Sequence, residues 1–140
     1  MNEENRWLTV ALVCMGALLF ILYSVKISPA HDSGQWGNAD PAIREWYQSL
    51  MQPDAPNASC CGEADAYWAD KVFVKDGKTY AEITDDRPDA PLGRPHREVG
   101  TVFEIPNHKL KWDRGNPTGH AIIFVSRNDY VYCFVQAGGV

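Results

Sequence analysis

The residues best suited to chemistry are two adjacent cysteines, Cys60 and Cys61, and a distant histidine, His120. A cysteine that starts a helix has its thiolate favoured by the helix N-terminus, and a histidine on a strand can serve as its base. Cys61 is therefore a candidate nucleophile, with His120 as its general base. However, residues 62–65 (Gly-Glu-Ala-Asp) place carboxylates beside the thiol, which raises a thiol pKa. The pattern favours a structural cysteine and a hydrogen-bonded histidine.

Cys60, Cys61 and His120 also form a candidate thiol–imidazole site for copper or zinc, with His96 and His108 as further ligands. The sequence contains no CxxC, HxH or HExxH spacing, so nothing in it specifies a metal. Histidines in polar loops are usually solvated. We therefore expect no metal and no other cofactor.

A group of aspartates could bind calcium or provide paired carboxylates for glycoside hydrolysis. Its members are Asp65, Asp70, Asp85, Asp86 and Asp89. No loop has EF-hand spacing, and three of these residues lie in a stretch rich in proline and charge, 85–98. We expect a solvated loop there rather than a binding site.

The chain is rich in aromatic residues, which in a small β domain usually pack in the core. Trp112 stands between two charged residues and is the best candidate for lining a groove. Trp46 lies in a predicted helix. We expect Trp46, Trp112 and the stretch 85–98 to be the surfaces that contact a partner.

Cysteine content also bears on the compartment. Adjacent cysteines rarely bond to each other, so in an oxidising environment Cys133 is expected to pair with either Cys60 or Cys61. Such a bond closes a loop of roughly 70 residues, worth about 4 kcal/mol in the chain-entropy model. One thiol is left over.

The N-terminal region predicts export. After a short tail, 1–6, residues 7–25 contain no charged side chain and are long enough to cross a hydrocarbon core of roughly 30 Å. We interpret 7–25 as a transmembrane signal-anchor helix, 26–39 as a tether and 40–140 as an extracytoplasmic β-rich domain. This places the chain in the inner membrane, spanning it once, with the domain in the periplasm. Cleavage after Ala30, which would release a secreted protein, is the alternative.

Helical signals are confined to the start of this domain. Asp40 and Pro41 are typical of a helix start, and the apolar residues that follow recur at i, i+3, i+4 and i+7. These residues are Ile43, Trp46, Tyr47 and Leu50. They predict one amphipathic helix that packs on the rest of the domain.

From Trp68 onward the pattern is that of strands. Asp76-Gly77 predicts a hairpin, and the stretch 120–125 is nearly all apolar, which predicts a central strand. Residues 130–135 predict a further strand. The fold class expected is therefore α+β and mainly β: a small antiparallel sheet or half-open barrel with one packed amphipathic helix, preceded by the transmembrane helix.

Several short motifs resemble those of known families. Residues 59–67 (SCCGEADAY), 105–109 (IPNHK), 116–120 (NPTGH), 131–134 (VYCF) and the ending 138–140 resemble a family of small exported or membrane-anchored alphaproteobacterial proteins with no established activity. This resemblance implies export, a cysteine-linked β-rich domain and a bacterial origin. Separately, the order of Cys61 and His120 resembles that of NlpC/P60-type cysteine peptidases, without the aliphatic residues that follow their nucleophile.

The net charge and the absence of certain motifs argue against some classes of function. The net charge of −5 argues against nucleic-acid binding, and no Gly-rich phosphate loop occurs. We expect a membrane-anchored periplasmic accessory or interaction module, a small subunit or partner of a membrane or envelope complex, and we favour a non-enzymatic role. The alternatives are a hydrolase of cell-wall peptides that uses Cys61 and His120, and the copper or zinc site.

Overall fold

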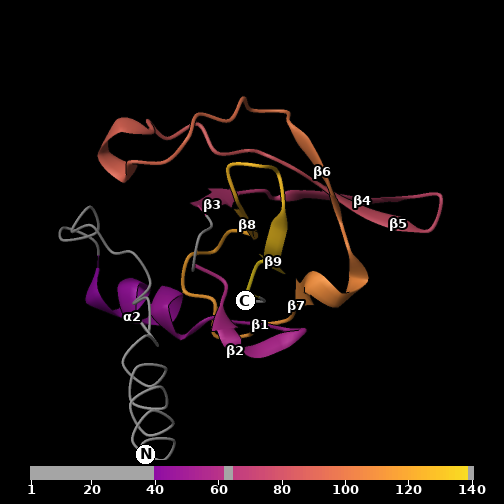
Figure 1. The fold of residues 1–140 in the computed structure, drawn as a ribbon. Coiled ribbons are helices and arrows are strands. Elements are labelled where there is room, and N and C mark those ends of the chain that lie inside the picture. Colours follow the sequence, from indigo (N-terminus) through magenta and orange to yellow (C-terminus); the bar gives the residue numbers. More distant parts are fainter. Residues whose placement is uncertain (1–39, 62–64, 139–140) are drawn as a thin grey trace, which may run out of the picture.

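The computed structural model describes residues 40–61 and 65–138 (Figure 1). The predicted tail, membrane segment and tether, 1–39, lie outside these residues. Within the described ranges, no helix combines the length and the apolar character needed to cross a membrane.

The domain begins with the predicted helix, α2 (Pro41–Ser49). The carboxylate of Asp40 accepts a hydrogen bond from the backbone N–H of Ala42 at 2.8 Å, which satisfies a free donor of the first turn. Leu50 caps the other end and is only 1 % exposed. The sequence prediction of a capped amphipathic helix is confirmed.

A short hairpin follows the helix, before Trp68, the residue from which the sequence predicted strands. Strands β1 (Met51–Gln52) and β2 (Ala55–Ser59) pair antiparallel with an irregular register. The backbone N–H of Cys60 then donates to the carbonyl of Leu50 at 2.9 Å. This hairpin carries the chain from the helix to the cysteines.

A four-stranded sheet forms the centre of the domain. Its strands are β3 (Asp65–Trp68), β8 (Ile122–Val125), β9 (Val131–Val135) and β7 (Leu110–Lys111), in that spatial order. Every residue of β8 is buried, so the predicted central strand is confirmed. However, β7 runs parallel to β9, so the expected small antiparallel sheet contains one parallel pair. Strand β8 follows β7 in sequence and runs antiparallel to β9, so the β8–β9 hairpin brings the chain back to the direction of β7.

A second, three-stranded antiparallel sheet contains β4 (Lys71–Lys75), β5 (Lys78–Glu82) and β6 (Val102–Ile105). The predicted turn joins β4 to β5. Asp76 and Gly77 have φ of 52° and 75°, the positive values that a tight two-residue hairpin turn requires. The β4–β5 hairpin projects away from the rest of the domain (Figure 1).

The central sheet has a hydrophobic cluster on each of its two faces, and each cluster packs against another layer of the domain. One cluster joins it to the three-stranded sheet, and includes Tyr67, Ile83, Phe103, Ile123 and Phe134. The other joins it to the helix and the first hairpin, and includes Leu50, Cys60, Phe124, Cys133 and Val135. The described residues therefore form a layered, mainly β fold with one α-helix and two short 3₁₀ helices, η1 (Ala90–Leu92) and η2 (Asn107–Lys109).

Candidate functional site

The structure assigns the disulfide to Cys60 and Cys133, which are 73 residues apart in sequence. Both cysteines are fully buried, in the cluster between the first hairpin and β9. The bond therefore holds the layer containing α2 onto the central sheet. The other pairing left open by the sequence, Cys61 with Cys133, is not the one formed.

Cys61 is the free thiol among the described residues. Its Sγ donates to the carbonyl oxygen of Tyr47 at 3.3 Å, and its backbone N–H donates to Ser59 Oγ at 3.1 Å. Burial raises the pKa of the Cys61 thiol to about 12. Cys60 and Cys61 form a turn after β2, so the helix start that would favour a Cys61 thiolate in a hydrolase is not found up to Cys61. A neutral thiol facing a carbonyl is poorly prepared for nucleophilic attack.

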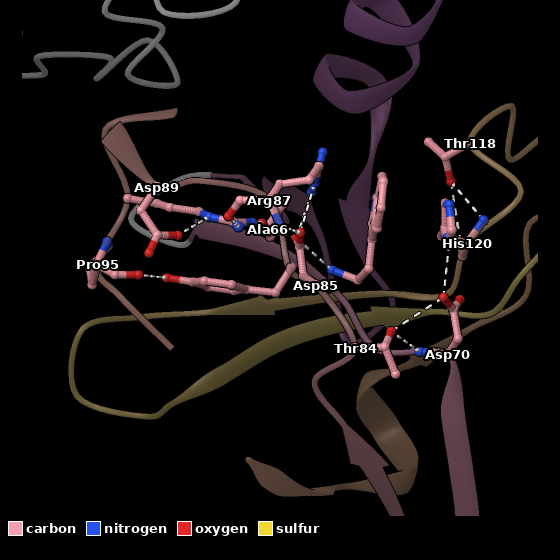
Figure 2. A network of polar contacts seen from close by, with 12 residues as sticks. Ala66, Asp70, Thr84, Asp85, Arg87, Asp89, Pro95, Thr118 and His120 are labelled. Atoms are coloured by element: carbon pink, nitrogen blue, oxygen red, sulfur yellow. Dashed lines mark hydrogen bonds and ion pairs between the residues drawn. The ribbon is translucent and has the colours of Figure 1, made fainter. Parts of the chain in front are cut away.

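His120 has a different partner. Its Nδ1 lies 2.8 Å from Asp70 Oδ2, and the other oxygen of Asp70 accepts the backbone N–H of Ala121 at 2.7 Å. Thr84 Oγ1 also donates to Asp70 Oδ2, at 3.3 Å (Figure 2). No hydrogen bond joins His120 to Cys61 in the described part of the chain. The carboxylate orients the imidazole, as in a catalytic Asp–His pair, but the predicted nucleophile is bonded elsewhere.

Trp68 connects the histidine to a second polar cluster. The His120 ring stacks on it with centroids 3.8 Å apart and planes 11° apart. The guanidinium of Arg87 lies 3.9 Å from the centroid of the same indole. Ring stacking therefore explains the position of the His120 imidazole, and cation–π attraction explains that of the Arg87 guanidinium.

The second cluster is centred on Asp85, whose carboxylate is completely buried. Arg87 donates to both its oxygens at 2.8 and 2.6 Å, Arg94 donates at 2.6 Å, and the backbone N–H of Trp68 adds a bond at 3.1 Å (Figure 2). Burial alone would raise the pKa of Asp85, but the hydrogen bonds from Arg87 and Arg94 outweigh it. The pKa therefore lies well below its ordinary range.

This cluster corrects the prediction that the stretch 85–98 is simply solvated. Arg94, with a side chain only 3 % exposed, also donates to Asp89 at 2.7 Å and to the carbonyl of Ala66 at 2.9 Å. His96 extends the network on the exposed side through Asp89. The stretch lacks strands because its charges, rather than apolar side chains, attach it to β3. It is therefore a fixed loop.

Two further motif residues hold loops in place. The Lys109 ammonium is buried and lies 2.8 Å from Asp54, which joins η2 to the first hairpin. The Asn116 amide donates to the carbonyls of His120 and Gln136 at 2.8 and 3.1 Å. A Cβ at position 138 would lie 2.7 Å from the Asn116 carbonyl oxygen, so only glycine fits there.

The candidate metal ligands do not converge. Cys60 is in the disulfide, and Cys61 and His120 have separate partners. Across residues 40–61 and 65–138, no group of three or more histidine, cysteine, aspartate or glutamate side chains is arranged to hold a metal ion.

The two predicted interaction tryptophans differ. Trp46 Nε1 donates to Asp113 Oδ2 at 3.0 Å and its ring packs on the core, so Trp46 fixes the helix. Trp112 is 64 % exposed and remains available for contact.

Strand β4 exposes apolar side chains that no contact described so far explains, and the sequence did not predict a site there. All five of its residues are exposed, and it lies at the edge of its sheet, paired with β5 alone. Val74 is 71 % exposed and Val72 is 42 % exposed. The signal that could have indicated an open edge is the lysine at each end of Val-Phe-Val, since edge strands often carry lysine.

No family model, curated protein or solved structure matches this chain.

Proposed function

We propose that this chain is an accessory module of a membrane or envelope complex, anchored in the inner membrane by residues 7–25, whose periplasmic domain binds a protein partner through β4. The observation that carries the proposal is the open edge of this strand. Its apolar side chains are exposed, with no other described strand beside them. Exposed apolar edge strands are normally blunted or covered, and one whose edge stays open presents unpaired backbone groups to which a further strand can bond.

The thiol and the histidine support this choice over a cysteine hydrolase. Cys61 is partly buried, and desolvation raises its pKa to about 12, so almost none of it is thiolate at neutral pH. His120 is oriented by Asp70 and stacked on Trp68. These two contacts explain the position of its ring without a role in binding a substrate.

The shape of the fold supports a binding role. The disulfide and the Asp85 cluster fix the central sheet and its loops. The β4–β5 hairpin projects from this cross-linked domain (Figure 1). A pre-organised surface loses little conformational entropy on binding, which favours its use as a docking element.

Site-specific photo-crosslinking of the full-length chain in its native membrane tests the proposal. A photo-reactive amino acid replaces Val74, and in a matched control it replaces Val99, which is 58 % exposed but lies in a turn. We expect one defined protein to be crosslinked from position 74 and not from position 99, with the product lost when Val72 is changed to Lys. Equal labelling from both positions, or none from position 74, would refute the role of β4.

A further inference from the structure

We propose that β4 receives an extended segment of a partner protein as an additional strand, and that this segment has an apolar centre with a carboxylate placed opposite Lys75. This inference rests on the proposed function and specifies the chemistry of the partner. It follows from the register of the three-stranded sheet and from the distribution of charge along the hairpin.

The register determines which side chains an added strand would meet. One face of the sheet carries the row Val72–Ala81–Phe103 and the row Val74–Thr79–Ile105. Ala81 and Ile105 are buried in the core, at 0 and 1 % exposed. The apolar face therefore continues past the core and ends, uncovered, at the two valines of β4.

The opposite face has a different composition. Phe73 stacks on Tyr80 with ring centroids 5.5 Å apart. An added strand would place one residue beside Phe73 on this face and two residues beside the valines on the other, because successive side chains alternate between faces. Its three central residues would therefore all be apolar or aromatic.

The charges flanking this apolar centre are unequal. Lys71 lies 2.7 Å from Glu82 across the hairpin, so its charge is already paired. Lys75 is exposed and sits directly opposite Lys78, whose ammonium is paired with Glu104 at 2.9 Å. In the described part of the chain Lys75 has no ion-pair partner. A carboxylate on the incoming strand would supply one and relieve the repulsion from Lys78.

The same charges disfavour a second copy of this chain as the occupant. Symmetric antiparallel pairing of two β4 strands about Phe73 would place Lys71 of one copy opposite Lys75 of the other, at both ends. Parallel pairing in register would set each lysine opposite itself. Like charges directly opposite each other destabilise a strand pair, whereas an acidic strand is stabilised in either direction.

A pair of capped peptides tests this inference. Thr-Glu-Val-Tyr-Val-Glu-Thr has the expected chemistry and the same residue order in both directions, and Thr-Lys-Val-Tyr-Val-Lys-Thr is its matched control. Each is titrated into the isotope-labelled full-length chain in detergent, with backbone amide NMR signals as the readout. We expect the acidic peptide to shift the signals of 71–75 and to bind about fivefold more tightly than the lysine peptide.

Two neutral variants assign the charge effect to one lysine. Lys75→Gln is expected to remove most of the preference for the acidic peptide, and Lys71→Gln, the matched control, to remove less, because Lys71 is already paired with Glu82. Equal affinities for the two peptides, shifts confined to other elements, or shifts that grow with protein concentration alone would overturn the inference. The last result would identify a second copy as the occupant.

This experiment can fail independently of the crosslinking test. A specific crosslink from position 74 without peptide discrimination would leave the proposed function standing and refute the chemistry assigned to the partner. Peptide discrimination without a crosslink would refute the proposed complex and leave β4 as an acceptor of acidic strands.

Discussion

Replacing Asp85 by Asn is expected to destabilise the domain severely. The carboxylate is fully buried and receives charged hydrogen bonds from Arg87 and Arg94. The asparagine keeps the shape and the bond from Trp68 N–H but leaves two guanidinium groups without their shared counter-charge. Breaking a buried ion pair on one side costs about 3–5 kcal/mol. Because Arg94 retains Asp89 and Arg87 is partly exposed, we expect about 3 kcal/mol.

Asp86→Asn is the matched control, because the neighbouring Asp86 is exposed. Urea unfolding of both variants gives the free energies, and thermal melting should show a fall of about 15 °C for Asp85→Asn in a domain of roughly 100 residues. Asp86→Asn should change the free energy by less than about 0.5 kcal/mol. If the two variants lose the same stability, Asp85 does not anchor the loop as described.

The loss should also depend on pH in a defined direction. The pKa of Asp85 is lower in the folded than in the unfolded state, so the ionised carboxylate stabilises the fold above the ordinary carboxyl pKa of about 4. That contribution is lost progressively as the pH falls from this value through the lower pKa of the folded state. The difference between wild type and Asp85→Asn should therefore be largest near neutral pH and shrink in acid. A difference that grows in acid would contradict the assigned charge state.

Three further predictions concern the cysteines and one histidine. Changing Cys60 and Cys133 together to Ala should lower the free energy of unfolding by about 4 kcal/mol, as measured in urea, since the bond closes a long loop; a loss under 1 kcal/mol would show that the bond does not constrain the fold. Cys61 should resist maleimide at pH 7.5 until denaturant is added, because burial raises its pKa to about 12. Labelling is followed by mass spectrometry, and rapid labelling of the folded protein would refute this prediction. The pKa of His96 is raised by hydrogen bonds to two carboxylates, so its contribution to stability is complete below its ordinary pKa of about 6.5 and is lost as the pH rises through the higher folded value. His96→Gln should accordingly lose more stability at pH 5 than at pH 9 in urea titrations, and an equal loss at both would contradict the pairing.

Local patterns predicted the elements that depend on local physics. The cap at Asp40 and the spacing of Trp46 and Leu50 indicated α2, and the Asp-Gly pair indicated the β4–β5 turn. The apolar run 120–125 indicated the central strand, because a strand buried on both faces needs no alternation. In each case the signal lies within a few residues of the structure it specifies.

Features that depend on long-range pairing were not accessible in this way. Strands β7 and β9 pair in parallel, but nothing in the residues of either strand indicates that the two are neighbours. Asp85 resembles any acid in a charged loop until Arg94 folds over it. Val72 and Val74 have the pattern of core residues, and only the sheet order shows that they lie at an uncovered edge.

Residue-resolved hydrogen exchange of the full-length chain without a partner tests the central claim, that the outer edge of β4 is open. In an antiparallel edge strand, alternate amides bond to the neighbouring strand and the others face outward. We expect slow exchange at the β4 amides that bond to β5 and fast exchange at the remaining ones. Protection of every amide from 71 to 75 would mean that the edge is already covered, and would contradict the account.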